Sequence, residues 1–133
     1  MAGASTFHVS VVTPEGAVLD CEATSAAFPA FDGEIGILPN HAPLLAKVGI
    51  GVLRVTSGGE TQRLFIDGGF AQVVDNRLSV LTEQARPVDE LDGAAVDELF
   101  EQARAATGSD EASVEARDAA YERARVQRRL TRS

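Results

Sequence analysis

The chain has 133 residues, 44% of them hydrophobic, and carries a formal charge of −8. This is enough for one ordinary domain, or for a small domain with an appendage. The negative charge argues against a nucleic-acid partner, and the single cysteine excludes a disulfide framework. Without a run of about 18 apolar residues, any contact with a membrane has to come through a partner.

The first 84 residues have the pattern of a β-sandwich. Apolar and polar residues alternate with a period of two at residues 7–12, and again at 51–56, 62–67, 71–74 and 78–81. Residues 18–28 read as one further extended run that Pro29 ends. The segments 13–16, 57–60 and 75–76 are typical turns between strands, whereas Gly68-Gly69 predicts a bulge or a tight corner.

Residues 31–43 (FDGEIGILPNHAP) are the most unusual stretch of the chain. They combine glycines and prolines with three large aliphatic residues, a composition that predicts a structured loop with apolar anchors. Two interpretations remain open from the residues alone. The stretch is either a well-packed crossover between strands or a surface that binds a partner.

Residues 85–133 change to a helical pattern. Asp89 is the expected N-cap of a first helix, in which Leu91, Ala95, Leu99 and Ala103 recur every four residues up to about Thr107, with Val96 and Phe100 beside them. Gly108 is the expected end of that helix, and Ser109 or Asp110 is the expected cap of a second one. We therefore predict an antiparallel helical hairpin that follows the sandwich.

The second helix has few large apolar side chains, so the hairpin is expected to be only marginally stable and mobile. Arginine dominates its end: residues 116–133 contain six arginines and two acidic residues. Two or three cations would suffice to complement the helix dipole. The excess therefore predicts an acidic partner surface.

No catalytic or metal-binding constellation stands out. His8 is expected to face solvent or a polar interface, and His41 to fix the loop by a hydrogen bond. HExxH, CxxC, GxSxG and phosphate-binding glycine motifs are all missing. We therefore expect a chain that is not an enzyme by itself and that carries no metal.

Several blocks of the chain form one recognisable pattern: residues 12–16 (VTPEG), 32–45 (DGEIGILPNHAPLL), 51–53 (GVL), 67–70 (DGGF), 75–76 (DN) and 80–82 (VLT). In order and spacing, these blocks resemble the epsilon subunit of the rotary F-type ATP synthase. The resemblance implies an α+β fold. An N-terminal antiparallel β-sandwich of about ten strands, residues 1–84, would be followed by a C-terminal two-helix hairpin, residues 85–133.

The resemblance also implies a role and partners. The chain would be a non-catalytic subunit of the central stalk that couples proton-driven rotation of the c-ring to ATP synthesis. Its sandwich would bind the gamma subunit and the c-ring, and its helices would reach the alpha and beta subunits and inhibit ATP hydrolysis. Its place would be the cytoplasmic face of a bacterial plasma membrane, as a peripheral protein.

The family's contact positions transfer to particular residues. The contacts with the c-ring and the gamma subunit would come from the loop, at Asp32, Glu34, Ile37, Leu38, Pro39 and His41. The inhibitory contact with acidic beta-subunit surface would come from the second helix, at Arg123, Arg125, Arg128 and Arg129.

Some members of that family bind ATP on the hairpin through an Ile/Leu-Asp-x-x-Arg-Ala motif. Residues 112–117 (ASVEAR) do not keep this register, which argues against nucleotide as a cofactor. A free-standing β-sandwich module, for example for carbohydrate, is the alternative function. One tyrosine and no tryptophan leave it little with which to stack sugar rings.

Overall fold

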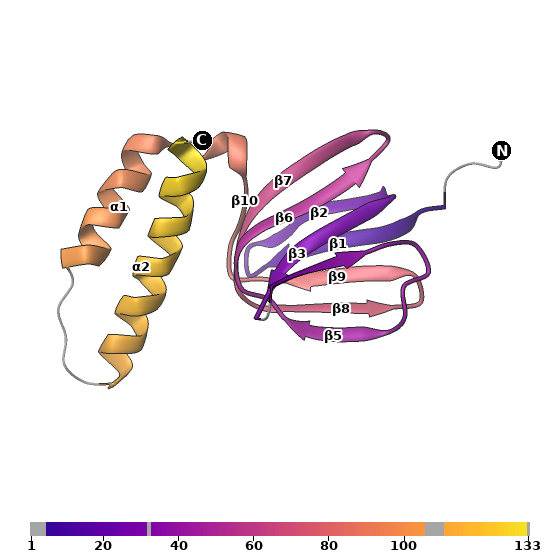
Figure 1. The fold of residues 1–133 in the computed structure, drawn as a ribbon, viewed down its shortest axis with the longest axis horizontal. Coiled ribbons are helices and arrows are strands. Elements are labelled where there is room, and N and C mark those ends of the chain that lie inside the picture. Colours follow the sequence, from indigo (N-terminus) through magenta and orange to yellow (C-terminus); the bar gives the residue numbers. More distant parts are fainter. Residues whose placement is uncertain (1–4, 32, 106–110, 133) are drawn as a thin grey trace. The chain divides into compact units, whose positions relative to one another are not determined.

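The computed structural model describes residues 5–31, 33–105 and 111–132, and it divides into two compact units (Figure 1). The first unit extends to Pro87 and the second begins at Val88, whereas the sequence placed the division between residues 84 and 85. The units are described separately below.

The first unit is built from ten strands within the described residues, as the sequence predicted. The strands are β1 (Phe7–Thr13), β2 (Gly16–Ala23), β3 (Ser25–Ala30), β4 (Gly33–Ile37), β5 (Leu44–Lys47), β6 (Ile50–Ser57), β7 (Glu60–Asp67), β8 (Phe70–Val74), β9 (Arg77–Leu81) and β10 (Ala85–Pro87).

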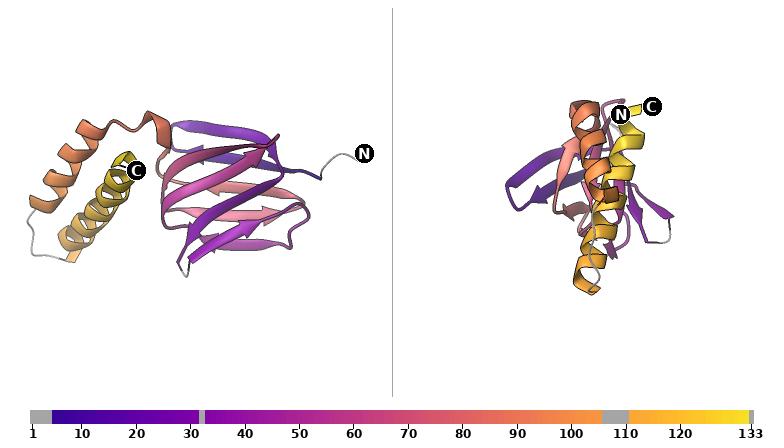
Figure 2. Two further views of the ribbon diagram at one scale, coloured as in Figure 1. Left: turned by 45° about the horizontal axis from the view of Figure 1, so that its top comes forward. Right: turned by 90° about the vertical axis from the view of Figure 1, so that its left-hand side faces the viewer.

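These strands form two five-stranded sheets that face each other as a sandwich (Figures 1 and 2). Sheet 1 has the order β2-β1-β9-β8-β5, and sheet 2 has the order β10-β7-β6-β3-β4. Neighbouring strands are antiparallel except for β1 and β9, which run parallel. The predicted antiparallel β-sandwich is therefore confirmed, with one parallel pair at the centre of sheet 1.

Alternate residues of each strand fill the space between the sheets, as a period of two requires. The core is mainly aliphatic with two phenylalanines, and burying each large side chain contributes about 1.5–3 kcal/mol. Its fully buried large members are Phe7, Val9, Val11, Phe28, Ile37, Leu53, Val55, Ile66, Leu78 and Val80.

The predicted single run at residues 18–28 is wrong in one respect, because it contains two strands in different sheets. The chain leaves β2 in sheet 1 and enters β3 in sheet 2 at Thr24, whose backbone N–H donates to the Thr56 carbonyl at 2.8 Å. Pro29 lies inside β3 rather than ending the run. The pairing of β3 with β6 stops at Ala27, so the ladder loses no donor at the proline.

Two tight turns of the sandwich have the backbone that their residues favour. Gly58 and Gly59 have φ of 60° and 84°, and Asp75 and Asn76 have φ of 51° and 61°. Two successive positive φ angles match the twist of the flanking strands in a two-residue hairpin. Both turns are at the predicted positions.

Pro87 is the last residue of β10. This short strand lies at the edge of sheet 2, where it pairs with β7 at residues 64–66. An edge strand is one of the few places in a sheet that tolerates proline.

The second unit is the predicted helical hairpin. A single 3₁₀ turn, Val88–Glu90, precedes α1 (Gly93–Ala105), and α2 spans Glu111–Arg132. The predicted caps at Gly108, Ser109 and Asp110, and the expected helix end near Thr107, lie outside the described residues.

The N-cap of α1 is Asp92 and not Asp89. The Asp92 carboxylate accepts a hydrogen bond from the Ala94 backbone N–H at 3.0 Å, and the Asp92 carbonyl accepts one from Val96 at 2.9 Å. Asp89 lies in the preceding 3₁₀ turn, where it is too early in the chain to cap α1.

The apolar stripe of α1 also differs from the predicted one. Val96 and Ala103 are buried and Phe100 is half-buried, whereas Leu99 is 50% exposed. The inward positions therefore follow the spacing 96, 100 and 103. This spacing keeps one face of a helix toward α2.

Candidate functional site

The loop that the sequence singled out is half strand and half turn. Residues 33–37 form β4, which pairs with β3, and the chain then turns through residues 38–43 into β5. Asp32, one of the predicted contact residues, lies outside the described residues. The loop is therefore a rigid extension of sheet 2 at Glu34 and Ile37 and a tight turn beyond them.

The predicted contact residues of the loop differ in exposure. Ile37 is 1% exposed and packs in the core, so it anchors the loop and its side chain is not available to a partner. Leu38, the next residue, is 63% exposed. Glu34 is exposed, and Pro39 and His41 are half-buried.

Hydrogen bonds hold the turn in one conformation. The His41 backbone N–H donates to the Leu38 carbonyl at 3.2 Å, and the His41 ring nitrogen Nδ1 donates to the Ala42 carbonyl at 2.8 Å. This confirms that His41 fixes the loop. Asn40 has a positive φ of 63°, which an asparagine tolerates better than most residues.

Asn76 connects the loop to the tip of the β8–β9 hairpin, a role that the sequence did not indicate. Its side-chain oxygen accepts from the Asn40 backbone N–H at 2.7 Å, and its Nδ2 donates to the Thr6 carbonyl at 2.8 Å. These two bonds join three segments that are far apart in the chain.

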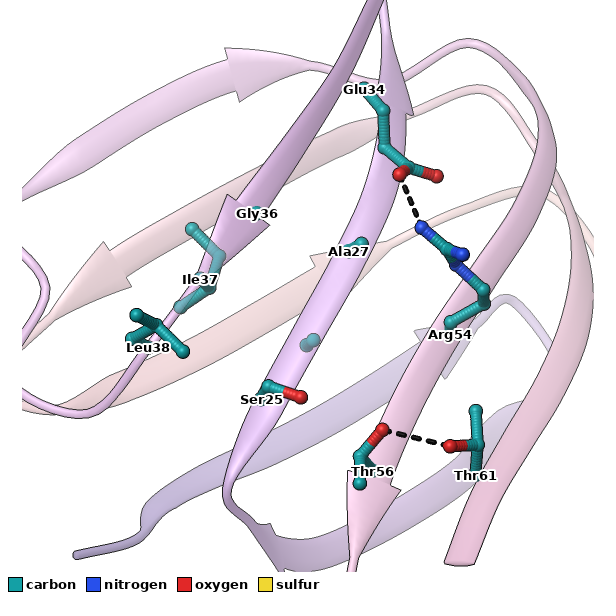
Figure 3. A pocket seen from close by; sticks show the side chains of 10 residues that line it. Ser25, Ala27, Glu34, Gly36, Ile37, Leu38, Arg54, Thr56 and Thr61 are labelled. Carbon is teal, nitrogen blue, oxygen red and sulfur yellow. Dashed lines mark hydrogen bonds and ion pairs between the residues drawn. The ribbon is translucent and has the colours of Figure 1, made fainter.

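A shallow hollow of about 530 Å³ lies on the outer face of sheet 2, beside the loop (Figure 3). Its floor consists of small residues, among them Ser25, Ala27 and Gly36. Glu34 and Arg54 form an ion pair at its rim, and Leu38 lies nearby. Arg54 was not among the predicted site residues.

The outer face of sheet 1 carries a second surface that sequence analysis missed. Five large apolar side chains there are between 40% and 71% exposed: Val18, Leu45, Phe70, Val74 and Leu81. They come from four strands, and Phe70 is directly opposite Leu81 in the ladder. A hollow of about 400 Å³ adjoins these two residues, lined also by Val12 and Pro14.

We call this set of five side chains the apolar face of sheet 1. Large exposed apolar side chains on one face of a folded protein commonly mark a protein–protein interface. The sequence contained a signal for this face. Three of the six outward positions of β8 and β9 hold Phe70, Val74 and Leu81, and the other three hold polar residues, whereas a fully solvated face would be polar throughout.

The four arginines predicted for the second helix have different surroundings. The Arg128 Nε lies 3.3 Å from the Asp97 carboxylate of α1, and its guanidinium stacks on the Phe100 ring. Arg125 makes two hydrogen bonds to Glu122 within α2, at 2.7 and 3.1 Å, and the bond to Arg125 is the main cause that lowers the pKa of Glu122. Arg123 is half-buried and Arg129 is exposed.

Nothing in the described part of the chain resembles a catalytic centre. His8 lies on the outer face of sheet 1 between two carboxylates, with Nε2 2.5 Å from Asp20 and Nδ1 2.9 Å from Glu22. Cys21 packs toward the core, and burial raises the pKa of its thiol, which disfavours the reactive thiolate. In residues 5–31, 33–105 and 111–132, no group of three or more His, Cys, Asp or Glu could hold a metal ion.

Neither described α-helix combines the length and apolar character that a bilayer crossing needs. The features that remain are two surfaces on the sandwich and an arginine-rich helix. Their chemistry suits contacts with other proteins.

Comparison with known proteins identifies relatives of both units. The family model for the ATP synthase, Delta/Epsilon chain, beta-sandwich domain matches residues 6–88. The ATP synthase epsilon chain of Rhodopirellula baltica is 43% identical over 122 residues, which cover 92% of this chain and 95% of that one. The epsilon chain of Desulfitobacterium hafniense is 46% identical over 89 residues, 67% of each chain.

Solved structures share the fold. A chain in the cryo-EM structure of the Euglena gracilis mitochondrial ATP synthase superposes with a TM-score of 0.82 at 24% identity, covering 98% of this chain and 86% of that chain. A chain in the central stalk and c-ring structure of the Tetrahymena thermophila mitochondrial ATP synthase superposes with a TM-score of 0.73 at 15% identity, covering 93% of this chain and 95% of that one.

Proposed function

The chain belongs to the family of ATP synthase epsilon chains, non-catalytic subunits of that complex, and from this premise we propose that it couples rotation of the c-ring to the catalytic head. The driving ion in this proposal is the proton. The observation that carries it is the apolar face of sheet 1, because a stalk subunit needs a broad surface that a partner covers.

The gamma subunit is the proposed partner of the apolar face of sheet 1. Phe70 and Leu81 lie at its centre, next to the hollow that Val12 and Pro14 line. Large apolar side chains at the middle of a patch supply most of the affinity of an interface. Polar residues such as Lys47 and Arg77 stand in register with Phe70 and Val74 and would form part of the rim.

The loop is proposed to meet the c-ring and the gamma subunit through Asp32, Glu34, Leu38, Pro39 and His41. The hydrogen bonds of His41 and Asn40 support this role, since a contact that transmits torque has to be stiff before the partner binds. Ile37 contributes as the buried anchor of the loop rather than as a contact.

The hairpin is proposed to inhibit ATP hydrolysis when α2 reaches the alpha and beta subunits. Arg123, Arg125, Arg128 and Arg129 would then face acidic beta-subunit surface. The thin apolar interior of the hairpin, with Val96 and Ala103 as the buried residues of α1, supports the idea that α2 can leave α1. The proposal places the chain at the cytoplasmic face of a bacterial plasma membrane and assigns it no nucleotide.

Co-purification with the gamma subunit tests the proposal. We expect the wild-type chain to form a stoichiometric complex, and Phe70→Ser together with Leu81→Ser to weaken it by roughly tenfold or more. Leu99→Ser is the matched control, because it removes a similarly exposed apolar residue from α1 and should leave gamma binding unchanged.

A wild-type chain that stays monomeric in the presence of gamma would contradict the stalk function and favour the free-standing binding module. Loss of binding in the control as well would point to a folding defect. The thermal unfolding of each variant, measured in parallel, identifies that defect.

A further inference from the structure

The ion pair between Glu34 and Arg54 spans three strands of sheet 2. Glu34 belongs to the edge strand β4 and Arg54 to β6, with β3 between them. In the ladder, Arg54 is opposite Ala27, whereas Glu34 is opposite Pro29, two residues farther along β3. Strands lie about 4.8 Å apart, so the two side chains have to extend across β3 to meet.

A small residue of β3 beside the pair makes the crossing possible. Ala27, which is opposite Arg54, lines the same hollow, and Figure 3 shows the Arg54 guanidinium and the Glu34 carboxylate directed toward each other beside it. A larger side chain at position 27 would reach into the space that the pair uses.

Stability alone does not account for this pair. Both side chains are about half exposed, and ion pairs in that environment contribute little to the free energy of unfolding. The pair does limit the rotamers of the long Glu34 side chain. Arg54 Nη2 donates to Glu34 Oε1, and Figure 3 shows the Glu34 carboxylate directed toward the guanidinium.

We propose that Arg54 is a positioning residue for Glu34: the ion pair holds the Glu34 carboxylate in one orientation at the rim of the hollow, where a donor group of the docking partner can reach it. The inference rests on the proposed function, in which Glu34 is one of the loop residues that meet the c-ring. Ordering a flexible side chain before docking lowers the entropic cost of the contact.

A double-mutant cycle on the assembled gamma–epsilon–c-ring complex tests the inference. We expect Glu34→Gln to weaken binding of the chain, and Arg54→Gln to weaken it by about three- to tenfold through the lost orientation of Glu34. In the Glu34→Gln background, Arg54→Gln should have no further effect. Arg54→Lys should restore part of the affinity, because it returns a cation.

Arg63→Gln is the matched control. Arg63 is opposite Arg54 in the β6–β7 ladder, is exposed, and lies one strand farther from Glu34. The Arg63→Gln substitution changes the net charge of this face of sheet 2 by the same amount as Arg54→Gln does. Thermal unfolding of every variant is expected to stay at the wild-type temperature, which separates positioning from a structural role.

Each contrary result has its own meaning. The positioning role is overturned if Arg54→Gln weakens binding equally in the wild-type and the Glu34→Gln backgrounds. It is also overturned if Arg63→Gln weakens binding as much as Arg54→Gln does. If Glu34→Gln weakens binding but Arg54→Gln has no effect, the positioning role is again overturned, whereas the proposed function stays intact. Normal binding of Glu34→Gln contradicts the Glu34 contact itself and thus the basis of the inference.

Discussion

The guanidinium carbon of Arg128 lies 4.3 Å from the centre of the Phe100 ring, which connects α2 to α1 across the hairpin. The same ring is 5.4 Å from the ring of Tyr121, and Asp97 pairs with Arg128 from the other side. In a hairpin with few buried apolar residues, this cluster is a large part of what holds the two helices together.

Phe100→Leu is therefore expected to destabilise the hairpin by about 1 kcal/mol, since a cation–π contact contributes about 0.5–1 kcal/mol and an aromatic pair about as much. Hydrogen exchange of the α2 amides in the full chain measures the change. Leu99→Ala removes a neighbouring, half-exposed side chain and should have a smaller effect. Equal acceleration of exchange in both variants would contradict the role of the ring.

The same substitution bears on regulation. Arg128 is one of the four arginines proposed to meet the beta subunit, and in the hairpin its guanidinium is already engaged by Phe100 and Asp97. Weakening the contact between Arg128 and Phe100 shifts the equilibrium of the hairpin toward the form in which α2 has left α1. We expect Phe100→Leu to inhibit ATP hydrolysis more strongly than wild type in the assembled complex, and unchanged or weaker inhibition would oppose this view.

The cap of α1 gives a second prediction. Asp92→Ala should cost about 1 kcal/mol of helix stability, because it leaves the Ala94 N–H without its carboxylate acceptor. Asp89→Ala is the control, three residues earlier in the 3₁₀ turn, and it should cost little. Circular dichroism during thermal unfolding distinguishes the two. A larger effect at Asp89 would restore the cap that the sequence alone suggested.

Gly69 is the glycine of the sandwich at which a side chain should be tolerated least. A Cβ built there would lie 1.8 Å from the Leu81 carbonyl oxygen, and the residue has φ of 104°. Gly69→Ala should therefore cost about 3 kcal/mol or more, since overpacking and unfavourable φ each cost about 1–3 kcal/mol. Gly58→Ala has a positive φ but open space around it, and should cost only about 1 kcal/mol.

Chemical denaturation of both glycine variants checks this expectation. If Gly69→Ala and Gly58→Ala lose the same free energy of unfolding, the backbone near Leu81 can move away from the new Cβ at no cost. A Gly69 variant as stable as wild type would show that the corner between β7 and β8 can adopt another backbone.

Glu122 should make the hairpin sensitive to acid. The hydrogen bond from Arg125 lowers the pKa of Glu122 below its ordinary value of 4.5. A carboxyl group with a lower pKa in the folded state stabilises the fold above its unfolded pKa, and this contribution is lost as the pH falls through the folded pKa. Because the group is largely exposed, the contribution is small.

Arg125→Gln is expected to raise the pKa of Glu122 toward 4.5, which a carbon-13 NMR titration of its side-chain carboxyl measures. Arg104→Gln is the control, because Arg104 pairs with Glu101 on α1 and should leave the titration of Glu122 unchanged. An unaltered Glu122 titration in the Arg125 variant would exclude the hydrogen bond as the cause.

Much of this fold was predictable from local patterns. Alternation identified most strands, and the turns at Gly58 and Asn76 followed from residues that accept positive φ. The assignment of β2 and β3 to different sheets was not predictable, because a strand alternates in the same way in either sheet. The cap was ambiguous because Asp89, Glu90 and Asp92 all suit the start of a helix.

The sites were harder to predict than the strands for physical reasons. Glu34 and Arg54 are 20 residues apart and meet only because β3 lies between their strands, so sheet order is needed to find the pair. Ile37 is a neighbour of exposed Leu38, yet the pleat turns the two side chains to opposite faces. Resemblance to a family predicts a contact segment, and the structure separates the buried residues of that segment from the exposed ones.

The parallel pairing of β1 with β9 has a consequence for biosynthesis. β9 is the middle strand of sheet 1, yet it is nearly the last strand of the sandwich to be translated. A nascent chain that ends before residue 76 leaves β1 with an open edge, and the bond from Asn76 to Thr6, 70 residues away, cannot form. Sheet 1 is thus completed late on the ribosome, when α1 and α2 are still being made, and slow closure is expected for such distant strands.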